Sequence, residues 1–246
     1  MRPLAGRAGG PLLSRSGWQM APGERAALEG VLADVKPRLA IEIGTAQGGS
    51  LERIAAHSEE VHAFDFEAQV DPAAYPNVTF HHGDNHVLLP QLLGEFERAG
   101  RNVDFVLVDA DHSSAGVRRD LEDLLRSGAV RETFILLHDT MNEGVSSGLE
   151  AVDLDAHPKV VFCDLGFVQL DPHARGLREI WGGLGLVICD EHGRLGITPE
   201  RRDRDRSWRA ALGVGLWRAL APARAARRRA RERLGDALRR WRGRRF

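Results

Sequence analysis

Residues 39–57, LAIEIGTAQGGSLERIAAH, decide the fold class of this chain. The first five residues form an apolar run that is typical of a buried strand, with Glu42 as its one polar residue. A glycine-rich turn begins at Gly44, and the pattern from Leu51 to His57 predicts a helix. A strand, a glycine-rich turn and a helix in this order predict a parallel sheet whose turn can approach a ligand closely, because glycine has no side chain.

The same alternation continues along the chain. Further strands are predicted at 61–65, 78–82, 103–108, 132–138, 159–165 and 184–190, and further helices at 22–37, 87–100, 116–126 and 144–152. Pro90 is expected in the first turn of its helix or at the end of a preceding short turn. The alternation implies right-handed crossovers and a doubly wound, Rossmann-like α/β sheet that is mostly parallel. Because only a loop separates the last two strands, we expect an antiparallel pair at one edge.

Composition and cysteine content indicate a soluble protein of a reducing compartment. The chain has 246 residues, of which 43% are hydrophobic and 28% are charged. Its two cysteines, Cys163 and Cys189, lie far apart, which favours no cysteine-built metal site. No apolar run is long enough for a signal peptide or a membrane span, so we expect a cytoplasmic protein.

Charge divides the chain into an acidic body and a basic tail. Residues 201–246 hold 17 Arg against 4 acidic residues, a net charge of +13, whereas the rest holds 17 Lys and Arg against 31 acidic residues, a net charge of −14. We therefore expect a flexible amino terminus at 1–16, one α/β domain at 17–198 and an Arg-rich, amphipathic helical tail at 199–246.

Two partners are open for this tail. If the tail forms helices, their arginine-rich faces and the Leu and Trp residues between them would suit peripheral contact with an anionic membrane. The alternative is an arm that docks on the acidic body of the same chain or of a neighbouring subunit, as in a homo-oligomer. Nucleic acid is not expected as a partner, because aromatic residues for base stacking are few.

The turn after the first strand predicts a cofactor site. Gly44 and Gly48 allow close approach, and the amino terminus of the following helix favours an anionic group. Asp65 ends the next strand, 21 positions after Gly44, where it can accept hydrogen bonds from ribose hydroxyls. A dinucleotide site requires G-x-G-x-x-G to admit a pyrophosphate. Here Thr45 and Ala46 carry side chains between the glycines, which favours the smaller methionine carboxylate of S-adenosylmethionine.

Ionisable residues follow two neighbouring strands of the predicted sheet. VDADH (108–112) places Asp109, Asp111 and His112 after one strand, and HDT (138–140) places His138 and Asp139 at the end of the next. Adjacent parallel strands end side by side, so Asp109, His138 and Asp139 should converge. Facing carboxylates repel unless a cation lies between them, and magnesium binds one or two carboxylates. The sequence therefore predicts a divalent metal site.

Structural roles remain open for the same residues. Asp111 or Ser113 could cap the following helix, and Asp139 could cap the helix after His138. The segment 83–85, Gly-Asp-Asn, could frame an adenine or form an ordinary Asx turn.

Two other functions also remain open. A phosphohydrolase would use Asp109 and Asp111 as nucleophile and acid, although it needs a phosphate-binding lysine and the chain offers only Lys36 and Lys159. A non-catalytic module that binds S-adenosylmethionine could instead recruit partners through its basic tail.

Taken together, the motifs resemble a known enzyme family. IEIG (41–44), Asp65, GDNHVLLPQL (83–92), VDADH and HDT are similar to motifs of class I S-adenosylmethionine-dependent O-methyltransferases of the metal-dependent catechol and caffeoyl-coenzyme A type. The segments DADHSSAGVRRDLE (109–122) and LLHDT (136–140) are most similar to the macrocin-type and cephalosporin-hydroxylase-like branch, which includes sugar O-methyltransferases. The resemblance covers about residues 17–190.

The resemblance implies a role for each matching residue. His112 would be the general base, and Asp109, His138 and Asp139 would bind Mg²⁺ or Mn²⁺. His138 stands where the family has a carboxylate. If its nitrogen is a ligand, it favours manganese or a softer ion, and the alternative is that His138 supports the ligands without contacting the ion. The residues implied in cofactor binding are Glu42, Gly44, Thr45, Gly48, Ser50, Asp65, Gly83, Asn85 and Asp111, with His86 at the adenine edge.

The methyl acceptor implied by the resemblance is a hydroxyl of a small molecule or a saccharide. Residues 17–20 would close over the cofactor. These residues and the segment 166–183 would set the acceptor specificity.

Overall fold

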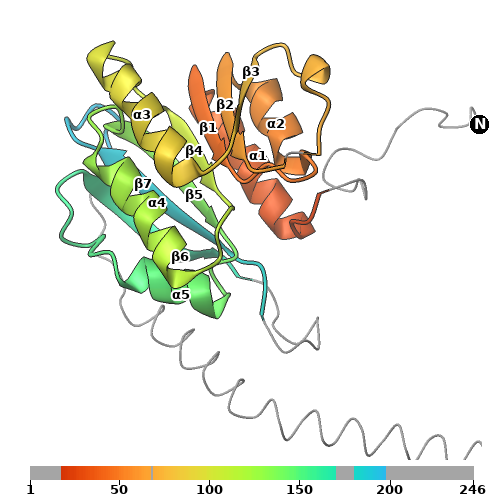
Figure 1. Cartoon of the computed structure of the whole chain (residues 1–246). Coiled ribbons are helices and arrows are strands. Elements are labelled where there is room, and N and C mark those ends of the chain that lie inside the picture. Colours follow the sequence, from red (N-terminus) through yellow and green to blue (C-terminus); the bar gives the residue numbers. More distant parts are fainter. Residues whose placement is uncertain (1–17, 68, 170–179, 198–246) are drawn as a thin grey trace, which may run out of the picture. The chain divides into compact units, whose positions relative to one another are not determined.

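The computed structural model describes residues 18–67, 69–169 and 180–197, which are coloured in Figure 1. All of these residues fall in one compact unit. The expected amino-terminal segment 1–16 and the basic tail 199–246 lie outside the described residues, so the division of the chain stays a prediction. Within the described part, no helix is both long enough and apolar enough to cross a membrane.

Helices and strands alternate as the sequence predicts. The helices are α1 (Pro22–Val35), α2 (Gly49–His57), α3 (Asn85–Arg98), α4 (Ser114–Arg126) and α5 (Glu143–Glu150), with a short 3-10 helix at Pro72–Ala74. The strands are β1 (Leu39–Ile43), β2 (Glu60–Asp65), β3 (Val78–His82), β4 (Phe105–Val108), β5 (Glu132–His138), β6 (Val160–Val168) and β7 (Leu184–Asp190). Every predicted element is present, and the ends differ from the predicted ones by a few residues.

The strands form one sheet of seven in the order β3-β2-β1-β4-β5-β7-β6. Strands β1 to β5 pair in parallel, whereas β7 runs antiparallel to both β5 and β6. The predicted doubly wound, mostly parallel sheet with an antiparallel pair at one edge is confirmed. The strand that runs against the others is β7, one place in from the edge. Strand order reverses between β1 and β4, which is where such sheets bind ligands.

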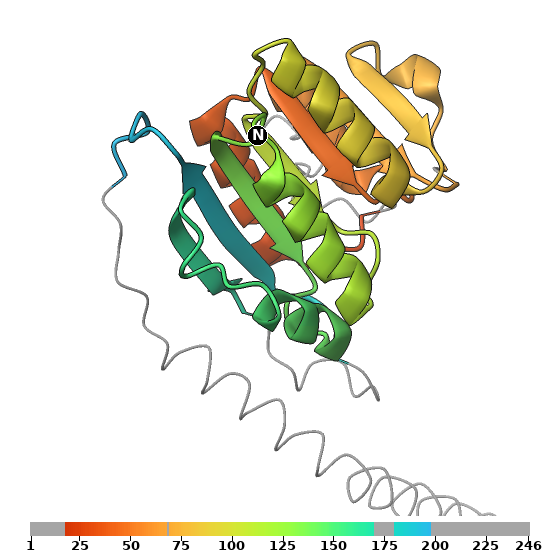
Figure 2. The ribbon, with the colours of Figure 1, turned by 60° about the vertical axis from the view of Figure 1, so that its left-hand side comes forward.

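Alternate residues of β1 build two cores, one on each face of the sheet. Ile41 and Ile43 pack among side chains of α3, α4 and α5, whereas Ala40 packs among side chains of α1 and α2. Figure 2 shows α3 and α4 in front of the strands and α1 behind them. Because helices cover both faces, the carboxyl ends of the strands are held on a rigid base.

Pro90 lies inside α3, so the expectation that it belongs to the first turn or to a preceding turn was wrong. Proline has no N–H to donate to the carbonyl of His86, four residues before it. The guanidinium of Arg119, on α4, donates to this carbonyl at 3.2 Å. A neighbouring helix therefore satisfies the acceptor that proline leaves, and α3 continues to Arg98.

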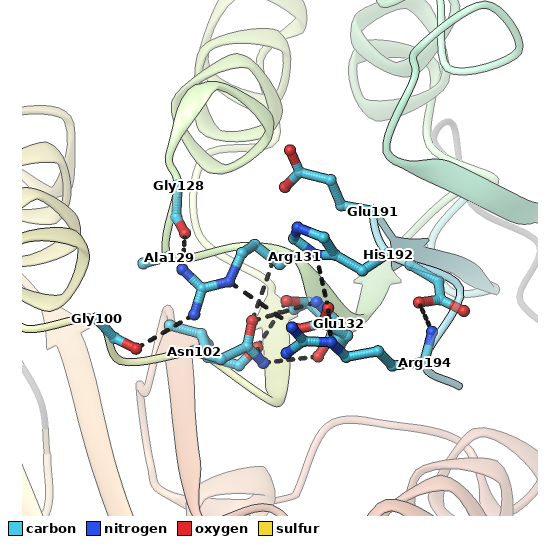
Figure 3. A network of polar contacts seen from close by, with 12 residues as sticks. Gly100, Asn102, Gly128, Ala129, Arg131, Glu132, Glu191, His192 and Arg194 are labelled. Carbon is cyan, nitrogen blue, oxygen red and sulfur yellow. Dashed lines mark hydrogen bonds and ion pairs between the residues drawn. The ribbon is translucent and has the colours of Figure 1, made fainter. Parts of the chain in front are cut away.

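Hydrogen bonds between polar residues connect β4, β5 and β7 at the end of the sheet where β4 and β5 begin (Figure 3). The side chain of Asn102 accepts hydrogen bonds from the backbone N–H groups of Arg131 and Glu132, both at 3.2 Å. The guanidinium of Arg131 donates to the carbonyl of Gly128 at 2.6 Å. The Glu132 carboxylate contacts His192, just past β7, at 3.0 Å. Three strands are thus joined at the end away from their ligand-binding edge.

Candidate functional site

A cavity of about 850 Å³ opens at the carboxyl ends of β1, β2, β4 and β5, and its size is within the usual range for a ligand site. The turn after each of these strands contributes to its wall. Residues 18–20 and Trp181 also contribute. Most of the residues predicted for the cofactor line it: Gly44, Thr45, Ser50, Asp65, Gly83, Asn85 and Asp111. Glu42 and Gly48 are not part of its wall.

The glycine turn is packed against the end of β4. Gly44 has a φ of +95°, and a Cβ on it would lie 2.2 Å from the carbonyl oxygen of Asp109. A Cβ on Gly49 would lie 2.6 Å from the Cα of Trp18. Neighbouring backbone therefore leaves no room for a side chain at Gly44 or Gly49.

Glu42 supports this turn from behind. Its buried carboxylate accepts hydrogen bonds from the hydroxyls of Ser50 at 2.6 Å and Thr45 at 3.0 Å. Burial raises the pKa of Glu42 to about 8, although the two hydroxyls act in the opposite direction. Glu42, which was predicted to bind the cofactor, thus holds two side chains that line the cavity, those of Thr45 and Ser50.

Asp65 joins the turn to the end of β2. Its Oδ2 accepts the backbone N–H groups of Thr45 at 2.9 Å and Ala46 at 2.7 Å. Its Oδ1 accepts the backbone N–H of Glu67 at 2.8 Å. A carboxylate can accept about four hydrogen bonds, so capacity for about one more remains for a ligand. Phe66 follows Asp65, lines the cavity and is 68% exposed.

The segment after β3 rests on a buried carboxylate. Asn85 Nδ2 donates to Asp120 Oδ1 at 2.6 Å, and His86 Nδ1 lies 3.2 Å from the same oxygen. Burial, with the nearby charges of Asp111 and Asp123, raises the pKa of Asp120 to about 7. Asp120 therefore anchors Asn85 by a hydrogen bond and lies beside His86, and both of these residues line this end of the cavity.

Four ionisable side chains meet at the tips of β4 and β5. His138 Nδ1 lies 2.9 Å from Asp109 Oδ1 and 3.4 Å from Asp139 Oδ2. His112 Nε2 lies 3.1 Å from Asp139 Oδ2 and 3.5 Å from Asp109 Oδ1. The structure thus brings together the residues that the sequence predicted to converge.

The carboxylates of this cluster hold positive charge on the imidazoles. The nearby carboxylates of Asp109 and Asp139 raise the pKa of His112 to about 9. Burial lowers the pKa of His138, but Asp109, Glu24 and Asp139 outweigh it and raise that pKa to about 11. Burial raises the pKa of Asp139, yet the two imidazoles and a backbone N–H leave it below its ordinary value.

This donor set fits a divalent cation. Asp109, His138 and Asp139 each offer one ligand atom, and these atoms lie within 4.8 Å of one another. Neighbouring ligands of an ion bound at about 2.1 Å lie roughly 3 Å apart, close to the separations within the cluster. Within this cluster, Nε2 of His112 and Nε2 of His138 are buried without an aligned hydrogen-bond partner.

Other residues cap the helices that follow the cluster. Ser113 caps α4 by accepting the N–H of Gly116 at 3.1 Å, and Asn142 caps α5 by accepting the N–H of Gly144 at 2.9 Å. Asp139 is not a cap and has a left-handed φ of 55°. Its backbone therefore turns sharply at the end of β5.

Comparison with known proteins identifies the segment that carries these turns. Residues 41–140 match the family described as "Methyltransferase domain". All residues predicted for the cofactor, the metal and the base lie within this match. No curated protein matches the chain in sequence.

Solved structures resemble the whole described fold. An O-methyltransferase from Bacillus cereus in complex with SAH is 17% identical, with a TM-score of 0.52 over 69% of this chain and 82% of that chain. The O-methyltransferase TomG from Streptomyces achromogenes, in complex with SAM, is 15% identical, with a TM-score of 0.50 over 70% of this chain and 81% of that chain. At these identities the likeness shows the fold, which is the fold that the resemblance to class I O-methyltransferases implied.

Two residues of the cavity wall, and one residue that contacts the cluster at the tip of β5, were missed or only broadly anticipated. Trp181, within the predicted specificity segment, packs edge-on against His112 with ring centroids 5.1 Å apart. Phe66 was missed, although an aromatic residue directly after Asp65 could have indicated it. Glu24, on α1, was missed because no local pattern joins it to the tip of β5.

Proposed function

We propose that this protein transfers the methyl group of S-adenosylmethionine to a hydroxyl of a small-molecule or saccharide acceptor. A divalent ion, Mg²⁺ or Mn²⁺, would be bound by Asp109, His138 and Asp139. The observation that carries this proposal is one cavity that joins the glycine turn and Asp65 to the cluster at the tips of β4 and β5. Cofactor and acceptor can then bind side by side.

The cofactor would occupy the end of the cavity at β1 and β2. Asp65 would accept hydrogen bonds from the ribose hydroxyls, and Asn85 would face the adenine edge. Phe66 offers an exposed ring on which adenine can stack. Asp111 would lie beside the amino-acid portion. The remaining proposed cofactor residues, which form or support the turn, are Glu42, Gly44, Thr45, Gly48, Ser50 and Gly83.

Methyl transfer requires an acceptor oxygen in line with the sulfonium methyl group at about 3 Å. When bound, the divalent ion supplies Lewis acidity that lowers the pKa of the acceptor hydroxyl. His112 Nε2, which lies between Asp109 and Asp139, would take the proton once the carboxylate charge is offset. The bond from sulfur to the methyl group breaks as the bond from oxygen to the methyl group forms.

The acceptor would bind beside Trp181, whose ring packs against His112. An aromatic face next to a base suits a sugar ring or a phenol. We favour a saccharide because the sequence resembles a branch that includes sugar O-methyltransferases.

The two other functions receive less support. Phosphohydrolase activity would need a cation for the phosphate, yet no Lys or Arg belongs to the described wall of the cavity. Lys159 donates to the carbonyl of Ser127 instead. A non-catalytic binding module would have no use for the cluster of Asp109, His112, His138 and Asp139.

Calorimetry with S-adenosylmethionine, with and without Mn²⁺ or Mg²⁺, tests the proposal. We expect the wild-type protein to bind the cofactor and the ion. Asp109→Asn should lose ion binding and keep cofactor binding, whereas a control at the exposed Asp34, Asp34→Asn, should match wild type. Absence of cofactor binding would refute the proposal, and unchanged ion binding by Asp109→Asn would refute its metal site.

A further inference from the structure

Each of the two imidazole nitrogens of His138 has at least one carboxylate oxygen nearby. Nδ1 faces Asp109 and Asp139 at 2.9 and 3.4 Å, whereas Nε2 lies 3.6 Å from Oε1 of Glu24. Glu24 is 1% exposed and His138 is 7% exposed. The carboxylate of Glu24 comes from α1, outside the residues that match the methyltransferase family.

Glu24 is fixed in this position by two backbone groups. Its Oε2 accepts the N–H of Ala21 at 2.5 Å, and its Oε1 accepts the N–H of Gly183 at 2.5 Å. The neighbouring Gly182 donates its N–H to Asp139. Glu24 therefore connects the start of α1, the loop after Trp181 and the tip of β5.

We propose that Glu24 is a positioning residue that holds the His138 ring with Nδ1 toward Asp109 and Asp139, and so determines which divalent ion binds. The inference rests on the proposed function. A histidine ligand of a metal is commonly oriented by a carboxylate at its other nitrogen. A nitrogen donor beside two carboxylates favours Mn²⁺ over Mg²⁺, because Mg²⁺ prefers oxygen ligands.

A purely structural role for Glu24 predicts a different result. As the third residue of α1, Glu24 also satisfies an N–H at the helix start. If this were its whole role, substitution would lower stability without changing the preference between two ions. The ratio of the Mn²⁺ and Mg²⁺ affinities therefore separates a positioning role from a capping role.

The experiment measures Mn²⁺ affinity from the electron paramagnetic resonance signal of free Mn²⁺, with Mg²⁺ as competitor. Glu24→Gln keeps the size of the side chain and a carbonyl acceptor but removes the charge. We expect its Mn²⁺ affinity to fall about 10- to 100-fold, with a smaller fall for Mg²⁺. Affinity for S-adenosylmethionine without an ion should stay within about twofold of wild type.

Glu29→Gln is the matched control, because Glu29 lies on the same helix and pairs with Arg53 and His57 instead. It should leave both ion affinities unchanged. If Glu24→Gln does not fold, Glu24→Asp serves in its place, since it keeps the charge but moves it away from the ring. We expect it also to lower the Mn²⁺ to Mg²⁺ ratio.

His138→Asp supplies the decisive background. Without the imidazole, Glu24→Gln should no longer weaken Mn²⁺ binding. An equal loss in this background, or a wild-type Mn²⁺ affinity in Glu24→Gln, would overturn the positioning role alone. A wild-type protein that binds S-adenosylmethionine but neither ion would overturn the proposed metal site, and this inference with it.

Discussion

Replacing Gly44 with alanine should force the turn after β1 away from the end of β4. The new Cβ would lie 2.2 Å from the carbonyl oxygen and 2.6 Å from the carbonyl carbon of Asp109. A left-handed backbone costs an L-residue about 1–2 kcal/mol, and overpacking typically costs about 1–3 kcal/mol. We expect a loss of about 3 kcal/mol, a large share of the roughly 5–15 kcal/mol that stabilises a folded domain.

Urea unfolding followed by far-ultraviolet circular dichroism measures this loss. For a chain of this size, about 3 kcal/mol corresponds to a fall in Tm of about 6–12 °C. Gly94→Ala is the control, because its Cβ would meet nothing within 4 Å inside α3. It should stabilise the protein by about 0.5–1 kcal/mol. The reasoning fails if Gly44→Ala stays within about 0.5 kcal/mol of wild type or if both variants shift in the same direction.

Three further predictions concern residues beside or away from the cavity. The fold raises the pKa of Glu42 from 4.5 to about 8. Between these two pH values Glu42 is protonated in the folded protein and ionised in the unfolded chain. Stability should therefore fall as pH rises through this window, and Glu42→Gln should flatten the fall; urea midpoints measured across the window check this, and an unchanged slope contradicts it. Asn102→Ala should cost about 2–4 kcal/mol, because two backbone N–H groups lose their acceptor; a negligible change in Tm would count against the network. Pro90→Ala should stabilise α3 by about 1–3 kcal/mol. In the Pro90→Ala background the backbone N–H of residue 90 can donate to the His86 carbonyl, so Arg119→Ala should have almost no further effect on stability. A double-mutant cycle in which the two effects simply add would rule this out.

The sequence predicts the sheet because each strand depends on local pattern. The apolar run of β1 and the glycine turn after it identify the strand, the switch point and the cavity edge together. Convergence of Asp109 with His138 follows from the adjacency of β4 and β5, which the alternation of strands and helices implies. The strands and this convergence can be predicted from the spacing of apolar residues and the direction of the strands alone.

The rest depends on contacts between distant segments. Glu24 reaches His138 because α1 packs behind the tip of β5, and nothing in the helix pattern shows which strand it will meet. Pro90 remains inside α3 because Arg119 satisfies the His86 carbonyl, an interaction between two helices. Asp65 and Glu42, predicted to bind the cofactor, also fasten the turn through hydrogen bonds that spacing alone does not reveal.

The position of β7 limits how the chain can be divided. A fragment that ends at residue 140 would contain the whole match to the methyltransferase family but would lose the strand that pairs with β5 from Glu132 to His138. The released edge would expose backbone donors and acceptors beside the apolar Ile135 and Leu136, and open edges of this kind promote association between chains. The segment that matches the family is thus smaller than the segment that completes the hydrogen bonding of β5.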